Sequence, residues 1–109
     1  MQFVYKYIDK VPVISFSRED GSLVGYDINT FGEEVLSVLH NDTMKIAFDL
    51  RLNQYLNSYG LGELINIRHF FIERGIDCVL IINNKKIYKL LDMVGIEDLF
   101  ETIESEDQI

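Results

Sequence analysis

The hydroxyl of Ser58 is the group in this sequence that is best placed for chemistry. It lies in the stretch Asn57-Ser58-Tyr59-Gly60-Leu61-Gly62, which follows an apolar strand pattern ending at Leu50 and opens a helix pattern that runs to Arg74. A serine at such a junction is expected to be the helix N-cap, with its hydroxyl beside backbone N–H groups that lack intrahelical partners. Those N–H groups and the helix dipole also favour an anion, so the fold should tolerate a phosphate on Ser58. Ser58 is therefore a simple cap, a role that Asn57 could also fill, or a regulatory phosphate acceptor.

Gly60 and Gly62 lie inside the first turn of this predicted helix. Glycine in a helix costs roughly 1 kcal/mol relative to alanine. A sequence that accepts this cost at a strand-to-helix junction usually requires another group to approach the backbone closely. We therefore expect a contact surface beside Ser58.

The remaining polar groups do not form a catalytic or metal-binding set. His40 and His69 are not at metal-ligand spacing, and no second ligand type gathers near either. Gly60-Leu61-Gly62 lacks the further glycine of a dinucleotide fingerprint, and no lysine follows it to make a phosphate-binding loop. Ser58 has no evident general base nearby. The sequence therefore predicts neither an enzyme nor a metal or cofactor site.

Composition narrows the class of partner. The 109 residues carry a formal net charge of −8, which disfavours nucleic acids and anionic membranes. Hydrophobic residues make up 48% of the chain, as in folded globular proteins. The single cysteine, Cys78, lies in an apolar run, which favours a buried reduced thiol. Because the first residues lack the apolar core of a signal peptide and no run could span a membrane, we expect a cytoplasmic protein.

Aromatic and β-branched residues at the N-terminus predict two antiparallel strands, 3–8 and 11–16, joined by Asp9-Lys10. Pro12 cannot donate a ladder hydrogen bond, so it should lie at an edge or at the start of its strand. Thr30 and Glu33 have the spacing of a capping box, which predicts a helix that ends near residues 40–42.

The second half of the chain alternates strands and helices. Residues 44–50 and 77–82 read as strands, and Gly75 is a suitable terminator for the helix between them. A third helix should follow Asn83-Asn84 and end at Gly95, before a short strand at 100–103 and an acidic, solvated tail from about residue 104. This order predicts an α/β fold, with residues 1–109 forming a single domain.

These segments resemble a known family. The strand followed by the Asn57–Gly62 stretch is similar to the Asp-Ser-Ser/Thr-Gly-Leu-Gly signature of STAS domains, most closely to that of bacterial anti-sigma-factor antagonists. Residues 89–96, Lys-Leu-Leu-Asp-Met-Val-Gly-Ile, resemble the family's third helix, and Gly21-Ser22-Leu23 falls where the family has Gly-x-Leu-Asp. The order of elements matches from about Phe3 to Ser105. The resemblance implies a mixed sheet of four to five strands with helices packed mainly on one face.

The resemblance also implies a function. In that family a kinase that doubles as the anti-sigma factor phosphorylates the signature serine, the unphosphorylated antagonist binds the kinase and frees the sigma factor, and a phosphatase resets the cycle. Carried over, the acceptor is Ser58. Asn57, Tyr59, Gly60, Leu61 and Gly62 would form the partner-binding surface around it.

Three positions depart from the family pattern. Asn57 replaces an aspartate, Tyr59 replaces a small hydroxyl residue, and Val24 replaces the aspartate after Gly-x-Leu. A divergent antagonist is one interpretation. The alternative is a STAS interaction subunit that is not phosphorylated and serves another signalling or transporter-associated complex.

Overall fold

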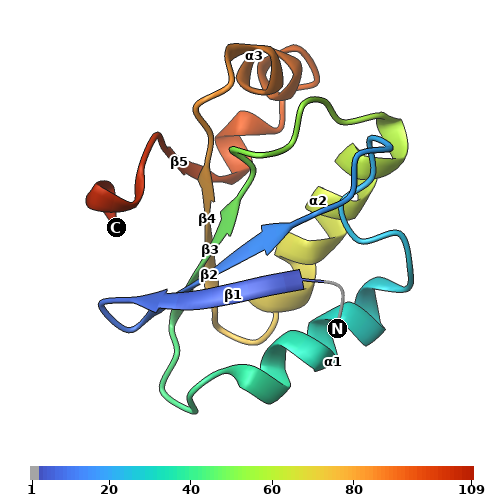
Figure 1. The fold of residues 1–109 in the computed structure, drawn as a ribbon. Helices are drawn as coiled ribbons and strands as arrows, with labels where there is room; N and C mark the ends of the chain where they lie inside the picture. The colour runs from blue at the N-terminus through green and yellow to red at the C-terminus, as the bar shows by residue number, and fades with distance from the viewer. Residues whose placement is uncertain (1–2) are drawn as a thin grey trace.

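The computed structural model describes residues 3–109, with only the backbone described at residue 97. The described residues form one mixed sheet of five strands, in the order β1-β2-β3-β4-β5 (Figure 1). The β1–β2 pair is antiparallel and the other three pairs are parallel. The strands are β1 (Phe3–Ile8), β2 (Val11–Phe16), β3 (Lys45–Asp49), β4 (Asp77–Ile81) and β5 (Glu101–Ile103). The helices are α1 (Ile28–Val38), α2 (Ser58–Ile72) and α3 (Lys85–Met93), with single 3-10 turns η1 (Glu97–Leu99) and η2 (Glu106–Gln108). The predicted α/β class and mixed sheet are confirmed.

The N-terminal hairpin has its predicted boundaries. Asp9 and Lys10 both have positive φ, 49° and 74°, which is the conformation that matches a two-residue turn to the strand twist. Pro12 lies at the start of β2, because pairing of β2 with β3 begins only at Val13. Its missing N–H therefore removes no bond from the ladder between β2 and β3.

One face of the sheet carries the main core and the helices. Neighbouring strands follow one another along the chain, so right-handed crossovers in a single direction place successive helices on the same face. Figure 1 shows α1 and α2 together on one side of the sheet and α3 at its upper end. Phe48 of β3 lies at the centre of this core, with its ring centroid 6.1 Å from that of Phe16 and 5.8 Å from that of Phe71.

The C-terminal tail packs over the opposite face. Val13, Ala47, Val79 and Ile81 form a small buried cluster there, and Ile109 packs against it. Glu106 pairs with Lys6 (2.8 Å) and with Arg51 (2.7 Å). The expectation of a solvated acidic tail is therefore wrong for Glu106, because two cations from β1 and from the segment after β3 hold its carboxylate on the sheet.

Arg51 also pairs with Asp49 at 2.7 Å, which extends this chain of charges into the sheet. Burial alone would raise the pKa of Asp49, but the hydrogen bonds and charge of Arg51 outweigh it and hold that pKa below its usual value. Hydrogen bonds from Lys6 and Arg51 lower the pKa of Glu106 in the same way. Both carboxylates therefore favour the charged form in the folded chain.

Two details of the predicted helices differ from the structure. Helix α1 begins at Ile28, and Asp27 is its N-cap, accepting a hydrogen bond from the Thr30 N–H (3.0 Å). The predicted capping box at Thr30 is wrong because a good capping carboxylate lies three residues earlier. Helix α2 ends at Ile72, two residues before the predicted end at Arg74. Gly75 has a φ of 75°, the left-handed conformation expected of a terminating glycine. Among the described helices, none is both long and apolar enough to span a membrane.

Candidate functional site

Asn57, rather than Ser58, is the N-cap of α2. Its side-chain oxygen accepts the Gly60 N–H (2.8 Å), and its side-chain amide donates to the Asp20 carbonyl (3.2 Å). Of the two predicted cap candidates, Ser58 is wrong and Asn57 is confirmed, because the two-sided amide of Asn57 serves both the helix and the loop between β2 and α1. Ser58 is the first helical residue and is exposed. Its hydroxyl is therefore presented to solvent instead of closing the helix.

Gly60 is closely approached, as its position in the first turn predicts, but by the chain itself. A Cβ at Gly60 would lie 2.2 Å from the Gly21 carbonyl oxygen, which also accepts the Asn57 N–H (2.9 Å). Gly62 differs, since a Cβ there would meet no other atom within 4 Å. The first glycine thus admits the β2–α1 loop, and the second leaves an open surface beside Ser58.

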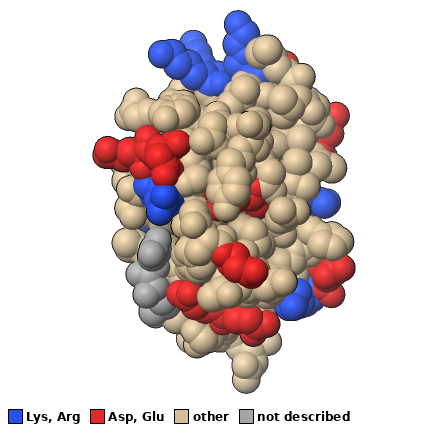
Figure 2. All heavy atoms as spheres, turned by 90° about the vertical axis from the view of Figure 1, so that its right-hand side faces the viewer, with Lys and Arg blue, Asp and Glu red and all other residues tan. Residues whose placement is uncertain are grey.

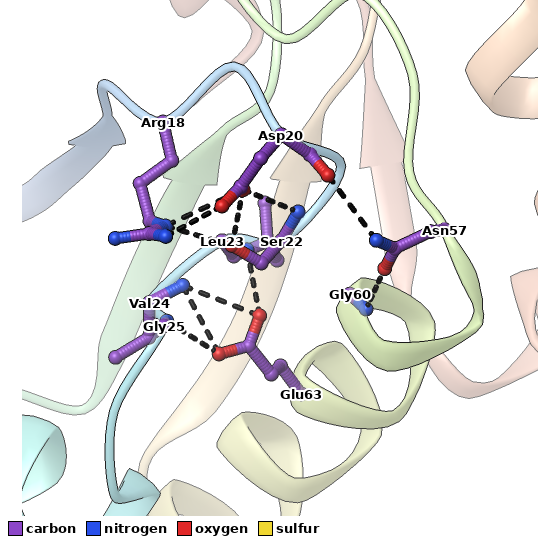
Figure 3. A network of polar contacts seen from close by, with 9 residues as sticks. All are labelled: Arg18, Asp20, Ser22, Leu23, Val24, Gly25, Asn57, Gly60 and Glu63. Atoms are coloured by element: carbon purple, nitrogen blue, oxygen red, sulfur yellow. Dashed lines mark hydrogen bonds and ion pairs between the residues drawn. The ribbon is translucent and has the colours of Figure 1, made fainter.

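Glu63 fastens the same loop to α2. Its carboxylate accepts hydrogen bonds from the backbone N–H groups of Leu23 (2.6 Å), Val24 (3.2 Å) and Gly25 (2.8 Å), and only 4% of the residue is exposed (Figure 3). The sequence analysis did not single out Glu63. The available signal was an acidic residue on the apolar face of α2, one turn after Gly60 and one turn before Ile67.

Hydrogen bonds among Arg18, Asp20 and Ser22 stabilise the conformation of the β2–α1 loop. Asp20 accepts hydrogen bonds from the Arg18 guanidinium, the Ser22 N–H (3.1 Å) and the Ser22 hydroxyl (Figure 3). The Arg18 contact is the largest reason why the pKa of Asp20 lies well below its usual range. Gly21 and Gly25 have φ of 89° and 80°, so the loop takes a path that other residues rarely adopt. The loop is consequently preformed beside the N-terminus of α2.

The surface around Ser58 combines exposed apolar groups with two carboxylates. Tyr59 is 58% exposed, and Ser58 and Tyr59 line a depression of about 490 Å³ together with Asp27 and Glu63. In Figure 2, which faces this side, uncharged side chains occupy much of the upper centre. Acidic ones lie at the upper left and lower down, and basic ones stand at the top, over α3. Of the predicted contact residues, Asn57 is exposed, Gly60 is buried, and Leu61 and Gly62 are half-buried.

The other reactive side chains lie in different surroundings. Cys78 is buried, and burial raises the pKa of its thiol to about 12, so it is unreactive at neutral pH. His69 forms an i,i+4 contact with Glu73 (2.9 Å), and the ring centroid of His40 lies 4.7 Å from that of Tyr7. Within residues 3–109, no group of three or more His, Cys, Asp or Glu side chains is arranged to hold a metal ion.

The family model of the STAS domain matches residues 5–109. This chain belongs to the STAS domain family. The match covers most of the hairpin, the Asn57–Gly62 signature and the tail, so it includes the elements that position Ser58.

Solved structures share the fold of this STAS domain at low sequence identity. The Thermotoga maritima protein TM1081 gives a TM-score of 0.75 at 20% identity, over 99% of this chain and 85% of that one. The anti-sigma factor antagonist SpoIIAA in its unphosphorylated form gives 0.65 at 12% identity, over 97% and 90% of the two chains. An anti-sigma factor antagonist from Mycobacterium paratuberculosis gives 0.65 at 18% identity, over 97% and 87%. No curated protein sequence matches this chain.

Proposed function

We propose that this STAS domain is an anti-sigma-factor antagonist that acts by partner switching in the bacterial cytoplasm. It binds a serine-kinase anti-sigma factor through the surface around Ser58, phosphorylation of Ser58 ends that binding, and a cognate phosphatase restores it. The protein is a binding module and not an enzyme. The observation that carries this proposal is the exposed Ser58 hydroxyl at the first position of α2, left unused because Asn57 performs the capping.

The local electrostatics favour a switch that leaves the fold intact. A phosphate adds a charge of about −1.5 to −2 at neutral pH. The first-turn amides of α2 and its dipole stabilise that anion. The exposed carboxylate of Asp27 lines the same depression as Ser58, so the added charge falls beside an existing negative charge. A partner that docks there would have to desolvate the phosphate and would meet its negative charge. Such a change at the centre of an interface commonly lowers affinity by tenfold or more.

The partner surface consists of Asn57, Ser58, Tyr59, Gly60, Leu61 and Gly62. Tyr59 is its best anchor, because an exposed aromatic side chain buries much apolar area at low entropy cost. Gly62 lets a partner backbone come close to the helix, since it has open space around it. Gly60 contributes indirectly, by allowing the β2–α1 loop to pack beside Ser58.

The proposal is tested by incubating the purified chain with ATP and a serine-kinase anti-sigma factor that binds it. Mass spectrometry should find a single phosphate, which Ser58→Ala abolishes and Ser17→Ala, at another exposed serine, retains. Modification at another residue, or no modification by a kinase that binds the chain, would contradict the regulatory part of the proposal.

A second candidate function is a constitutive STAS interaction subunit of another signalling or transporter-associated complex. Asn57 and the bulky, exposed Tyr59 beside the acceptor favour it. In that case Ser58→Asp should leave partner binding unchanged, whereas Tyr59→Ala should weaken it. A large loss of binding on Ser58→Asp, with Ser58→Ala as the matched control, supports the switch instead.

A further inference from the structure

The outward face of α3 has a composition unlike the rest of the surface. It carries Lys85, Lys86, Tyr88, Lys89 and Met93, which we call the α3 face. All five are exposed, and one carboxylate, Asp92, is exposed beside them. Tyr88 is 47% exposed and Met93 is 73% exposed. On the opposite side of the helix, Ile87 and Leu91 are buried in the core. The α3 face thus joins three cations to two apolar side chains on a helix that is firmly anchored from behind.

The three lysines stand out in an acidic chain that pairs most of its other cations. Lys6, Arg18, Lys45 and Arg51 all form ion pairs with carboxylates. Arg68 and Arg74 donate to backbone carbonyls instead, and Lys10, in the turn between β1 and β2, forms no ion pair within the described residues. For Lys85, Lys86 and Lys89, the described part of the chain supplies no ion pair. Figure 2 shows the resulting basic patch at the top of the molecule, over α3.

The positions of these lysines do not favour the helix itself. Lys85 and Lys86 are the first two residues of α3, where the helix dipole disfavours positive charge. Lys85 and Lys89 are four residues apart, a spacing at which like charges repel. Lys89 lies three residues before Asp92, a spacing that favours the helix, but Lys85 and Lys86 gain no such support. An external role therefore accounts for these two lysines better than a structural one.

The α3 face lies at the same end of the sheet as Ser58. Helices α2 and α3 both begin after the carboxyl ends of neighbouring parallel strands, β3 and β4. The two connecting segments touch, because the Asn84 side-chain amide donates to the Gln54 carbonyl (3.4 Å). A protein that covers the N-terminus of α2 can therefore reach the start of α3 as well.

We infer that the α3 face is a docking surface for an acidic segment of a protein partner, with carboxylates opposite the three lysines and apolar side chains against Tyr88 and Met93. The inference rests on the proposed function in one respect, that the partner is a protein. It adds the chemistry of that partner: an acidic surface with apolar groups among its carboxylates. Binding of the acidic segment to the α3 face does not depend on phosphorylation of Ser58, and it brings the partner close to Ser58.

Charge decides among the possible occupants. A chain with a net charge of −8 repels nucleic acid and anionic lipid as a whole, and three lysines are few against the many phosphates of either. Mixed apolar and cationic groups match a protein surface in which carboxylates surround apolar anchors. Attraction at such a surface is screened over about 8 Å at physiological ionic strength, so binding should weaken with salt.

The test uses a synthetic peptide of about four helical turns, with glutamate and leucine at helical spacing, titrated into the ¹⁵N-labelled full chain. Amide shifts should change in α3 and in the 51–57 segment, and the same peptide with glutamine for glutamate should not bind. Lys85→Glu/Lys86→Glu should weaken binding by roughly tenfold, whereas Lys10→Glu, at another exposed lysine, should change it little.

Three results would overturn the inference. These are amide shifts confined to regions away from α3, equal weakening by Lys10→Glu and by Lys85→Glu/Lys86→Glu, or tighter binding to single-stranded DNA or to phosphatidylserine vesicles than to the peptide. Failure here leaves the phosphorylation assay untouched, because that assay needs Ser58 and not the lysines. Conversely, an unphosphorylated Ser58 would leave the peptide result standing.

Discussion

Glu63 and Glu106 are two carboxylates that tie distant segments together, one on each side of the sheet. Glu63 is 4% exposed and holds three backbone amides of the β2–α1 loop. The Glu106 side chain is 24% exposed and pairs with the side chains of Lys6 and Arg51. Backbone donors in a packed loop have fixed positions and cannot turn to water, whereas long cationic side chains can. The β2–α1 loop beside Ser58 is therefore held rigidly by Glu63, whereas the C-terminal tail is held by ion pairs that water can replace.

The largest expected effect comes from removing the buried carboxylate. Glu63→Ala should lower the free energy of unfolding by about 3 kcal/mol or more, because it leaves two buried N–H groups and one part-buried N–H group without an acceptor. Glu106→Ala should cost only about 0.5–1 kcal/mol, as expected of part-exposed ion pairs. Urea denaturation followed by far-UV circular dichroism measures both, since the chain has no tryptophan. Equal losses would abolish the distinction between the two sides of the sheet.

The two glycines of the signature differ in their surroundings, because Gly60 packs against the β2–α1 loop and Gly62 has open space beside it. Gly60→Ala should destabilise the fold by about 2 kcal/mol, because the new methyl group must displace the Gly21 carbonyl. Gly62→Ala should raise stability by up to about 1 kcal/mol, because alanine is the better helix former and the space is empty. The same denaturation experiment compares them. A destabilised Gly62→Ala variant would contradict the open surface described beside Ser58.

Acid should weaken the ion pairs that hold the C-terminal tail. Asp49 and Glu106 both have folded-state pKa values below their usual 3.8 and 4.5. Their contribution to stability is therefore present above those usual values and is lost as pH falls through the lowered ones. Thermal unfolding from about pH 6 downward should show a decline in Tm that is shallower in Glu106→Gln. An identical decline in both proteins would show that other carboxylates govern acid unfolding.

The smallest effect on stability is expected at the cap. Asn57→Asp keeps the acceptor for the Gly60 N–H but loses the donor to the Asp20 carbonyl, so the net change should be within about 1 kcal/mol. The Asn57→Asp variant mainly tests function, because it restores the aspartate that the family signature has before the serine. Under the proposed switch, the variant should be phosphorylated at Ser58 at least as fast as the natural chain. A slower reaction would assign Asn57 a positive role in recognition.

Sequence patterns were sufficient for the elements whose signals are local. The β1–β2 hairpin follows from two apolar strands around Asp9-Lys10, and the helix ends at Gly75 and Gly95 follow from glycines with positive φ. The Asn57–Gly62 stretch identified the family and located Ser58 at the start of a helix. These features depend on residues close in the chain, so periodicity and turn chemistry determine them.

Tertiary structure alone decided which groups the signature contacts. Gly60 faces Gly21 across nearly forty positions of sequence, and Glu63 reaches the amides of residues 23–25 over a similar separation. Glu106 meets Lys6 and Arg51 only because β1 and β3 lie in one sheet beneath the tail. Such pairings depend on how the strands and helices pack, which no local pattern contains. The sequence left Ser58 and Asn57 as the two cap candidates. Only the folded β2–α1 loop shows that the Asn57 amide binds both the Gly60 N–H and the Asp20 carbonyl, which leaves Ser58 exposed.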